Sequence, residues 1–344
     1  MPTPKRQTRK TRTIPARQKN LSEAKIRRAQ QAAIARYLRP KHPDSRPHLR
    51  NADPGHNVVG IGIARKRTKG RDRAVGITFY VRHKLTPEQL KQWPALHRLP
   101  KKILGVPTDV LEAGEPRLLA NTTNTTNPAR PAHPGAQITV RQPNGNDQVG
   151  TFGALVEDDA GRRYVLCNNH VLADFGQNPA GTRVFQPAPP SRFARLSVTV
   201  PIDPSFPNDT DCALASLDSV TNADGRLRAP LGPLSSAEPA GVDHGTKVAK
   251  RGAVTGLRRG IVHSPAFAVD LGGFKFENLI QIEDDGAPFC DHGDSGALIV
   301  DRDTRAPVAL LMGRMGNFNF ACSLDRVLAR LSAALGSNLR LIIN

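Results

Sequence analysis

Short runs in which apolar and polar residues alternate dominate the chain from Gly135 onward. Gly, Pro, Asn and Asp residues separate these runs, and such residues favour tight turns. The pattern predicts β-strands over residues 137–141, 150–157, 163–167, 194–200, 212–216, 247–251, 260–269, 279–282, 297–301 and 306–312. Many short strands with turn signals between them indicate a mainly β fold, either a barrel or a sandwich.

The pattern changes near the carboxyl end, where apolar residues recur with helical spacing. Ser323 is suited to cap the start of this helix, and Gly336 is suited to end it. One apolar face is formed by Leu324, Val327, Leu328, Leu331 and Leu335. We therefore expect a C-terminal helix between Ser323 and Gly336.

A smaller unit with strands and a helix precedes the β-rich region. Thr86 and Gln89 form the pattern of a capping box, which predicts a short helix to about residue 96. Alternating segments predict strands at 57–65, 74–83 and 108–112. We assign residues 55–120 to a small α/β domain, 121–134 to an Asn-, Thr- and Pro-rich linker, and 135–344 to the β domain.

Positive charge is concentrated at the front of the chain. The net charge is +19, and residues 1–50 hold 15 Lys and Arg against two acids, Glu23 and Asp44. We assign residues 1–54 to a basic arm with a disordered start and a helix over about 21–38, whose thin apolar stripe predicts weak docking. Such an arm has the charge to contact nucleic acid or another anionic partner, although a solubilising tail has the same composition.

Three polar sites, in a fixed order, point to nucleophilic catalysis. Ser295 lies in a Gly-Asp-Ser-Gly tetrapeptide, whose glycines allow tight or positive-φ geometry. A serine hydroxyl is a poor nucleophile unless a base takes its proton, and that base needs an acid to orient it. His170 follows an apolar strand and Asp211 enters another, with Asp209 as the alternative acid in the preceding turn. The order His, Asp, Ser is that of the chymotrypsin-type arrangement.

The stretch from about Pro134 to Leu335 resembles trypsin-fold serine peptidases, in particular an intracellular branch with plant narrow-leaf type proteins and bacterial trypsin-like peptidases. The resemblance is carried by Asn-Asn-His-Val-Leu-Ala at 168–173, by the segment at 250–260, and by Gly-Asp-Ser-Gly with its following apolar strand. It extends into the front unit through residues 57–62 and 105–110. The chain departs from the family at Cys212, since a small or neutral residue commonly follows the catalytic acid there.

The resemblance implies a chymotrypsin-like fold of two six-stranded β-barrels with the active site in the seam between them. It implies His170, Asp211 and Ser295 as catalytic residues, and the backbone amides of Gly293 and Ser295 as an oxyanion hole. The substrate pocket is expected at Phe289, Met312, Gly313 and Arg314. Because no Asp stands at the expected pocket floor, small or medium apolar side chains are the expected specificity.

The four cysteines bear on the compartment. So few cysteines suit a reducing environment, and we expect a cytoplasmic protein. The resemblance leaves one disulfide open, because Cys290 and Cys322 stand at about the spacing of a bridge in secreted relatives. The first 30 residues lack the apolar region of a secretory signal, although their Arg-rich, acid-poor composition also fits an organelle transit peptide.

No membrane span, metal or cofactor is expected. The chain has no apolar run of the length that a bilayer requires, which is about 18 residues or more. It also lacks paired Cys or His metal motifs and the Lys-Ser or Lys-Thr of a phosphate-binding loop.

These patterns support two functions. The first is a serine endopeptidase that acts on protein or peptide substrates through an acyl-enzyme. The second is a latent or non-catalytic binding protein on the same fold, with the basic arm contacting nucleic acid or an anionic partner. The front unit carries no cluster of catalytic side chains, so we expect it to pack against the peptidase domain, cover its cleft or mediate assembly, including a homo-oligomer.

Overall fold

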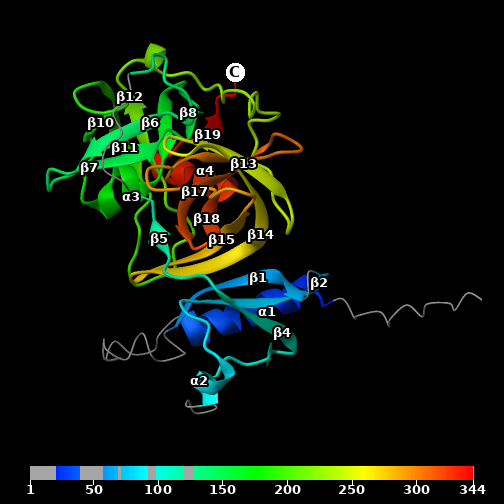
Figure 1. Ribbon diagram of the computed structural model, residues 1–344. Helices are drawn as coiled ribbons and strands as arrows, with labels where there is room; N and C mark the ends of the chain where they lie inside the picture. Colours follow the sequence, from blue (N-terminus) through cyan, green and yellow to red (C-terminus); the bar gives the residue numbers. More distant parts are fainter. Residues whose placement is uncertain (1–20, 39–56, 69–70, 92–97, 120–127, 344) are drawn as a thin grey trace, which may run out of the picture.

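The structure is a computed structural model that describes residues 21–38, 57–68, 71–91, 98–119 and 128–343. Two largely antiparallel β-sheets form most of the molecule, one drawn in green and the other in yellow and orange in Figure 1. A helix near the carboxyl end packs against strands of both. The predicted mainly β, double-barrel fold with a C-terminal helix is therefore confirmed.

The first sheet holds eight strands in the order β19-β8-β9-β12-β11-β10-β6-β7. Its core contains aromatic and aliphatic side chains that are fully buried, including Ile138, Phe152, Val165 and Phe193. The strands are β6 (Gln137–Arg141), β7 (Asp147–Thr151), β8 (Ala154–Asp158), β9 (Arg163–Cys167), β10 (Arg183–Phe185), β11 (Arg192–Thr199), β12 (Ala213–Leu217) and β19 (Leu339–Leu341). This sheet therefore has two strands more than the six expected, and one of the eight is β19 from near the end of the chain, which pairs with β8.

The second sheet contains a closed ring of six strands, as predicted for a barrel. The ring runs β13-β16-β17-β18-β15-β14 and closes because β13 also pairs with β14. Its strands are β13 (Lys247–Gly252), β14 (Gly256–Leu271), β15 (Phe274–Asp284), β16 (Leu298–Asp301), β17 (Pro307–Met315) and β18 (Phe318–Ser323).

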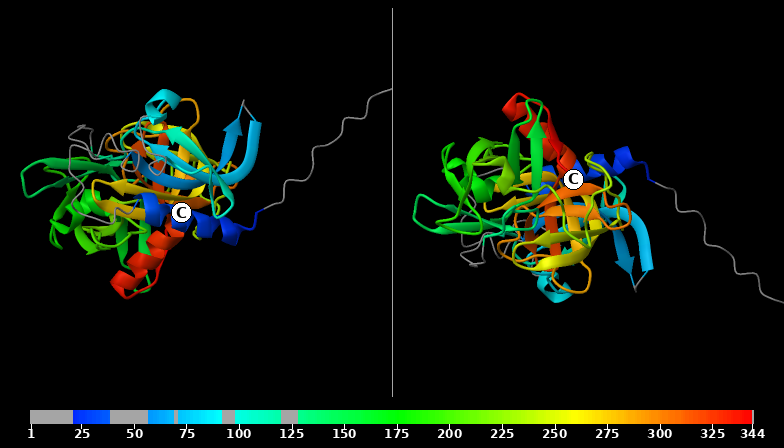
Figure 2. Two further views of the ribbon diagram at one scale, coloured as in Figure 1. Left: turned by 90° about the horizontal axis from the view of Figure 1, so that it is seen from below. Right: turned by 90° about the horizontal axis from the view of Figure 1, so that it is seen from above.

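The front unit is joined edge to edge to this second barrel. Strand β1 (Val58–Thr68) pairs with β14, with Gly60 opposite Val269 and Gly62 opposite Phe267. The remaining elements are β2 (Arg71–Val81), α2 (Pro87–Lys91), β3 (Lys102–Ile103), β4 (Val106–Glu112) and β5 (Arg117–Leu118). Figures 1 and 2 show the blue front strands against the yellow β14–β15 hairpin. The two parts thus share one continuous sheet.

Helix α1 (Glu23–Ala33) belongs to the core of the front unit. It begins at Ser22, whose hydroxyl accepts a hydrogen bond from the Lys25 N–H at 3.4 Å, and it continues as a π-helical turn over Ile34–Leu38. Its apolar face packs on β1, β2 and β4 through Ile26, Ala29, Ala33, Ile34 and Leu38. The expectation of weak docking is wrong, because the buried amide of Gln30 also donates to the Ala266 carbonyl at 2.8 Å.

The C-terminal helix α4 (Leu324–Leu335) follows its sequence pattern. Ser323 precedes it and Gly336 ends it with a φ of 72°, a left-handed conformation that favours glycine. Leu324, Val327 and Leu331 are fully buried. Three further helical segments are short: α3 (Asn169–Leu172), and 3₁₀ turns at Asp174–Gly176 and Val220–Asn222.

Several strand boundaries differ from expectation. The single strand predicted over 150–157 is two strands, because the chain turns at Gly153, where an added Cβ would lie 2.3 Å from the Gly296 carbonyl oxygen. The predicted strands 260–269 and 279–282 are the middle of the long β14–β15 hairpin, which turns at Gly272–Gly273.

Candidate active site

The structure brings His170, Asp211 and Ser295 together in the seam between the two barrels. The His170 Nε2 lies 2.9 Å from the Ser295 hydroxyl oxygen, and Nδ1 is hydrogen-bonded to Asp211 Oδ2. An ionised carboxylate only accepts hydrogen bonds, so Nδ1 carries the proton and Nε2 presents its lone pair to Ser295. This is the arrangement in which an imidazole can take the serine proton.

The first barrel holds the base and the acid. His170 lies in α3, directly beyond the end of β9, and its backbone N–H donates to Asp211 Oδ1 at 3.0 Å. The neighbouring amide of Asn168 donates to the Asp211 carbonyl at 2.8 Å. The Asn-Asn-His sequence therefore fixes the loop that carries His170 to the segment before β12 that carries Asp211.

Asp209, the alternative acid, lies elsewhere. Its carboxylate pairs with two guanidinium groups of α4, those of Arg330 at 3.0 Å and Arg326 at 3.4 Å. It is Asp211, not Asp209, that contacts His170.

The second barrel holds Ser295 and a backbone donor beside it. Gly293 has a φ of 97°, which a side chain would disfavour, and Gly296 has a φ of 90°. The Gly293 N–H donates to the carbonyl oxygen of Leu119 at 2.8 Å, while the Gly293 carbonyl accepts from the Thr151 hydroxyl at 2.9 Å. Of the two amides expected to form an oxyanion hole, the one at Gly293 thus already holds a carbonyl oxygen.

A buried ion pair holds the loop that carries Gly293 and Ser295. Lys250 and Asp294 are both fully buried, and the Lys250 ammonium lies 2.7 Å from Asp294 Oδ2. Asp294 also accepts from the backbone N–H groups of Val254 at 2.9 Å and Thr255 at 3.1 Å. At Gly252 an added Cβ would lie 2.3 Å from Asp294 Oδ1. The residue before Ser295 is therefore held from β13 and the turn that follows it.

The electrostatics of this pair favour an ionised Asp294. Burial alone would raise the pKa of Asp294, but the Lys250 charge and the hydrogen bonds to Asp294 lower the pKa below its usual value. Burial lowers the pKa of Lys250, and the Asp294 carboxylate opposes this effect.

The role of Lys250 was not predicted from the sequence. The local pattern gives little signal, because Lys250 shares its strand with two other basic residues, Lys247 and Arg251. Lysine is rarely buried unless it is paired, so the burial of Lys250 in the structure implies an acidic partner.

The predicted pocket residues have different surroundings. Phe289 is fully buried in an apolar cluster of the second barrel. The Met312 carbonyl oxygen lies 3.1 Å from the Ser295 hydroxyl oxygen, so it competes with His170 Nε2 for the one hydroxyl proton, and the Arg314 guanidinium donates to the Cys290 carbonyl at 2.8 Å. Gly313 and Arg314 pair with the short strand β5, which places β5 along the edge of the candidate site (Figure 1).

The site is covered. His170 has 1% of its surface exposed, and Ser295 and Asp211 have none. The aromatic ring of Phe175, which follows α3, lies 6.3 Å from the His170 ring and stacks on Phe274 at 5.0 Å.

All four cysteines are free thiols and buried, so the disulfide that the sequence left open between Cys290 and Cys322 is not formed. The Cys322 sulfur accepts from the Asp211 N–H at 3.2 Å, and the Cys290 thiol donates to Asn319 at 2.9 Å. Burial raises the pKa of Cys167, Cys212, Cys290 and Cys322.

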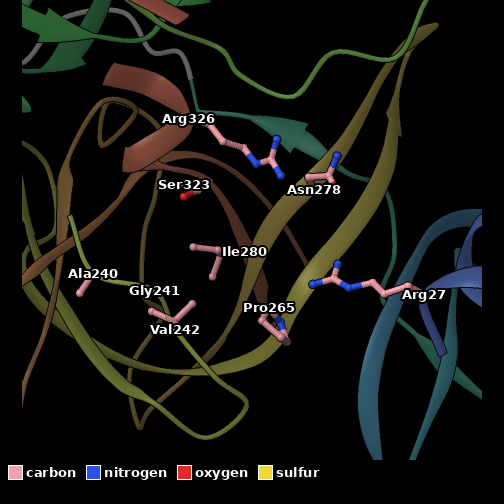
Figure 3. Close-up of a pocket in the computed structure, with 9 residues that line it drawn as sticks. All are labelled: Arg27, Ala240, Gly241, Val242, Pro265, Asn278, Ile280, Ser323 and Arg326. Carbon is pink, nitrogen blue, oxygen red and sulfur yellow. The ribbon is translucent and has the colours of Figure 1, made fainter. Parts of the chain in front are cut away.

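A separate pocket of about 200 Å³ lies between α1, the β14–β15 hairpin and the start of α4. Figure 3 shows the guanidinium groups of Arg27 and Arg326 approaching it from different elements, with Val242 and Ile280 among its apolar walls. None of the triad residues lines it.

Other predictions can be placed only in part. Most of the basic segment 1–50, proposed to contact nucleic acid, lies outside the described residues. In the portions that the structure does describe, no group of three or more metal-ligating side chains could hold an ion. None of the helices there is long and apolar enough to cross a membrane.

No family model and no curated protein matches the chain. Among solved structures it is similar to a Nocardiopsis protease, with 16% identity over 61% of this chain and 99% of that chain and a TM-score of 0.44. It is also similar to a glutamic acid specific serine protease (17% identity, 61% and 100% coverage, TM-score 0.46) and to a homologue of α-lytic protease (18%, 61% and 98%, 0.44). All three likenesses are remote.

Proposed function

We propose that this protein is a serine endopeptidase that hydrolyses peptide bonds through Ser295, His170 and Asp211. The observation that carries the proposal is the unbroken line of hydrogen bonds from Asp211 through His170 to the Ser295 hydroxyl. Such a line, buried and ending in a hydroxyl beside a backbone donor, is what acyl transfer to serine requires.

In the first step His170 Nε2 accepts the Ser295 proton as the oxygen attacks a substrate carbonyl. Asp211 holds the ring through Nδ1 and stabilises the imidazolium that forms. His170 then donates the proton to the leaving amine, which leaves an acyl-enzyme ester. A water molecule gives its proton to His170, attacks the ester and releases the acid product.

Backbone N–H groups stabilise the negative charge that develops on the substrate carbonyl oxygen. The Gly293 N–H points at a carbonyl oxygen, and the Ser295 N–H makes no backbone hydrogen bond within the part of the chain that the structure describes. Removing one such donor in other enzymes costs about 2.7–4 kcal/mol of barrier. Here the donors depend on loop geometry, so the Lys250–Asp294 pair has a positioning role.

We also propose that the enzyme works in the cytoplasm, because its four buried cysteines are all thiols. Fractionation of the source cells, followed by detection with an antibody, tests this; recovery in a secreted fraction would contradict it.

Labelling with a fluorophosphonate tests the catalytic proposal. The probe should add to Ser295 in the native protein or in Leu119→Asp, whose carboxylate should destabilise the segment that covers the Gly293 donor because the Leu119 side chain is buried in an apolar cluster. Ser295→Ala should abolish the adduct. Ser197→Ala is the matched control, because Ser197 is exposed on β11. Absence of any adduct on Ser295 in both forms would refute the function.

A further inference from the structure

A segment of the chain itself lies where a substrate would lie. Strand β5 pairs antiparallel with β17, with Leu118 opposite Gly313 and Arg117 opposite Arg314. At Gly313 an added Cβ would lie 2.5 Å from the Arg117 carbonyl oxygen, so glycine gives this backbone room to approach. Adding a strand to an open sheet edge is a common way for a protein to bind an extended peptide.

The residue after β5 engages the oxyanion donor. The Leu119 carbonyl oxygen accepts from the Gly293 N–H at 2.8 Å, two residues before the nucleophile in the sequence. In serine peptidases the carbonyl that is held by this donor is the one that the serine attacks. The carbonyl of Leu119 therefore accepts the hydrogen bond that the reacting carbonyl of a substrate would accept.

The side chains of the segment alternate as a bound substrate's would. Leu119 is fully buried in the same apolar cluster as Phe289 and Cys290, while Arg117 is exposed. Leu118 joins a different cluster, to which Phe175 and Phe274 also belong. A leucine thus fills an apolar site close to the Gly293 donor, which agrees with the apolar preference expected for the pocket.

We propose that the peptide bond on the carboxyl side of Leu119 is a substrate of the same chain's Ser295. This rests on the proposed function, and it names an apolar residue as the one recognised before the cut. In this proposal the segment also occupies the edge of β17 where other peptides would bind, beside the cover that Phe175 and Phe274 form.

The chemistry balances with water as the only co-reactant. Ser295 Oγ forms a bond to the Leu119 carbonyl carbon, and its proton passes to His170. The bond from that carbon to the nitrogen of Ala120 breaks, and the proton passes to the new amine. Water then hydrolyses the ester, which yields a carboxylate at Leu119, an amine at Ala120 and the original serine.

The two products should stay together in the native protein. Residues before the cut are held by the pairing of β1 with β14 and by the Gln30 hydrogen bond to Ala266. The cut would therefore be visible only after denaturation. It would fall just before the predicted linker at residue 121.

Full-length protein, freshly purified and denatured at intervals, tests the proposal by intact mass and by sequencing the new amino terminus. We expect a fragment that begins at Ala120, no cut in Ser295→Ala, and a rate that is unchanged over roughly hundredfold dilution because the reaction is intramolecular. Leu119→Asp should slow the cut on the order of 100-fold or more, since a carboxylate does not suit an apolar pocket. Leu104→Asp is the matched control, because Leu104 is an exposed leucine of the same unit (52% exposed), and it should be cut normally.

The outcomes distinguish failure of the self-cleavage proposal from failure of the proposed peptidase function. An uncut wild-type chain whose Ser295 nevertheless reacts with a fluorophosphonate would overturn self-cleavage and leave the peptidase function intact. A cut at another bond, or a rate proportional to protein concentration, would also overturn it. Failure of Ser295 to react in both the wild type and Leu119→Asp would instead remove the peptidase function itself.

Discussion

The two barrels contribute to the site in different ways. The first supplies the base and the acid from loops at the ends of β9 and β12, and its sheet receives only the terminal strand β19 from outside. The second supplies Ser295, the Gly293 donor and the Lys250–Asp294 pair, and its sheet continues into the front unit through β1 and pairs with β5. Under the proposed function, the groups that transfer the proton lie on one side of the seam, and the nucleophile and the Gly293 donor lie on the other.

This difference teaches that, within the described residues, the strands of the front unit pair with the second barrel and not with the first. The contacts of β1 with β14 and of β5 with β17 both involve strands of that ring. Variants in the first barrel should therefore alter turnover without loosening the front unit. Variants in the second barrel can alter turnover, stability or the accessibility of Ser295.

The largest effect is expected at the acid of the first barrel. Asp211→Asn should lower turnover on the order of 10⁴-fold with little change in fold, because an amide favours the wrong imidazole tautomer. Steady-state kinetics on a peptide or activated ester, with circular dichroism for the fold, measures this. Asp209→Asn is the control, because Asp209 pairs with Arg330 instead of His170. A larger loss of turnover in Asp209→Asn than in Asp211→Asn would mean that Asp209 is the catalytic acid.

The next effect is expected at the ion pair of the second barrel. Lys250→Met leaves Asp294 buried without its cation, which should cost about 3–5 kcal/mol of unfolding free energy and also lower turnover by releasing the Gly293 loop. Denaturant unfolding measures the loss. Lys247→Met, an exposed position on the same strand, should be nearly neutral, and adding Asp294→Asn should recover part of the stability because the unpaired charge is gone.

The same pair predicts acid sensitivity. Because the folded-state pKa of Asp294 lies below its usual value, the pair stabilises the protein above the unfolded-state pKa, and this contribution is lost as the pH falls through the lower folded-state value. Asp294→Asn should flatten the acid limb of the stability profile. An unchanged profile would show that other carboxylates control acid unfolding.

A smaller effect is expected where the front unit joins the second barrel. At Gly60 an added Cβ would lie 2.6 Å from the Phe267 ring, so Gly60→Val should cost about 1–3 kcal/mol by overpacking. Gly241→Ala, with nothing within 4 Å, is the control. If Gly60→Val left the melting temperature and the reactivity of Ser295 unchanged, the sheet shared by β1 and β14 would not link the front unit to the stability or the accessibility of the site.

The smallest effect concerns the cysteines, which are divided between the barrels. Burial blocks access and raises each thiol pKa, so iodoacetamide should modify none of them in the native protein near pH 8. Unfolding without a reductant should expose all four thiols to the reagent, as counted by mass. Two modified cysteines would indicate a disulfide.

The sequence predicts the local parts of this picture well. His170, Asp211 and Ser295 all stand near strand ends, where the alternation of apolar residues stops at a polar turn. The C-terminal helix ends at Gly336 as predicted and begins after Ser323, whose side chain makes no capping hydrogen bond. The meeting of His170, Asp211 and Ser295 could be expected only from the family resemblance, because no local pattern reports a distance across a seam.

What the sequence could not predict are contacts between distant segments. Gly60 and Gly62 interrupt an apolar strand, which is a sign of close backbone approach, but nothing there names Phe267 as the neighbour. Leu119 falls in no predicted element, and its contact with Gly293 is made by its backbone, which every residue shares. Strands β10 and β19 have only three residues each, and their pairing depends on partners in other parts of the chain.

A double-variant cycle across the seam tests the central claim most directly. His170→Ala, Ser295→Ala and the double variant should lose about the same turnover on an activated ester, because residues that act as one unit are strongly non-additive. Losses that multiply in the double variant would mean that the two barrels act independently, and the account would be wrong.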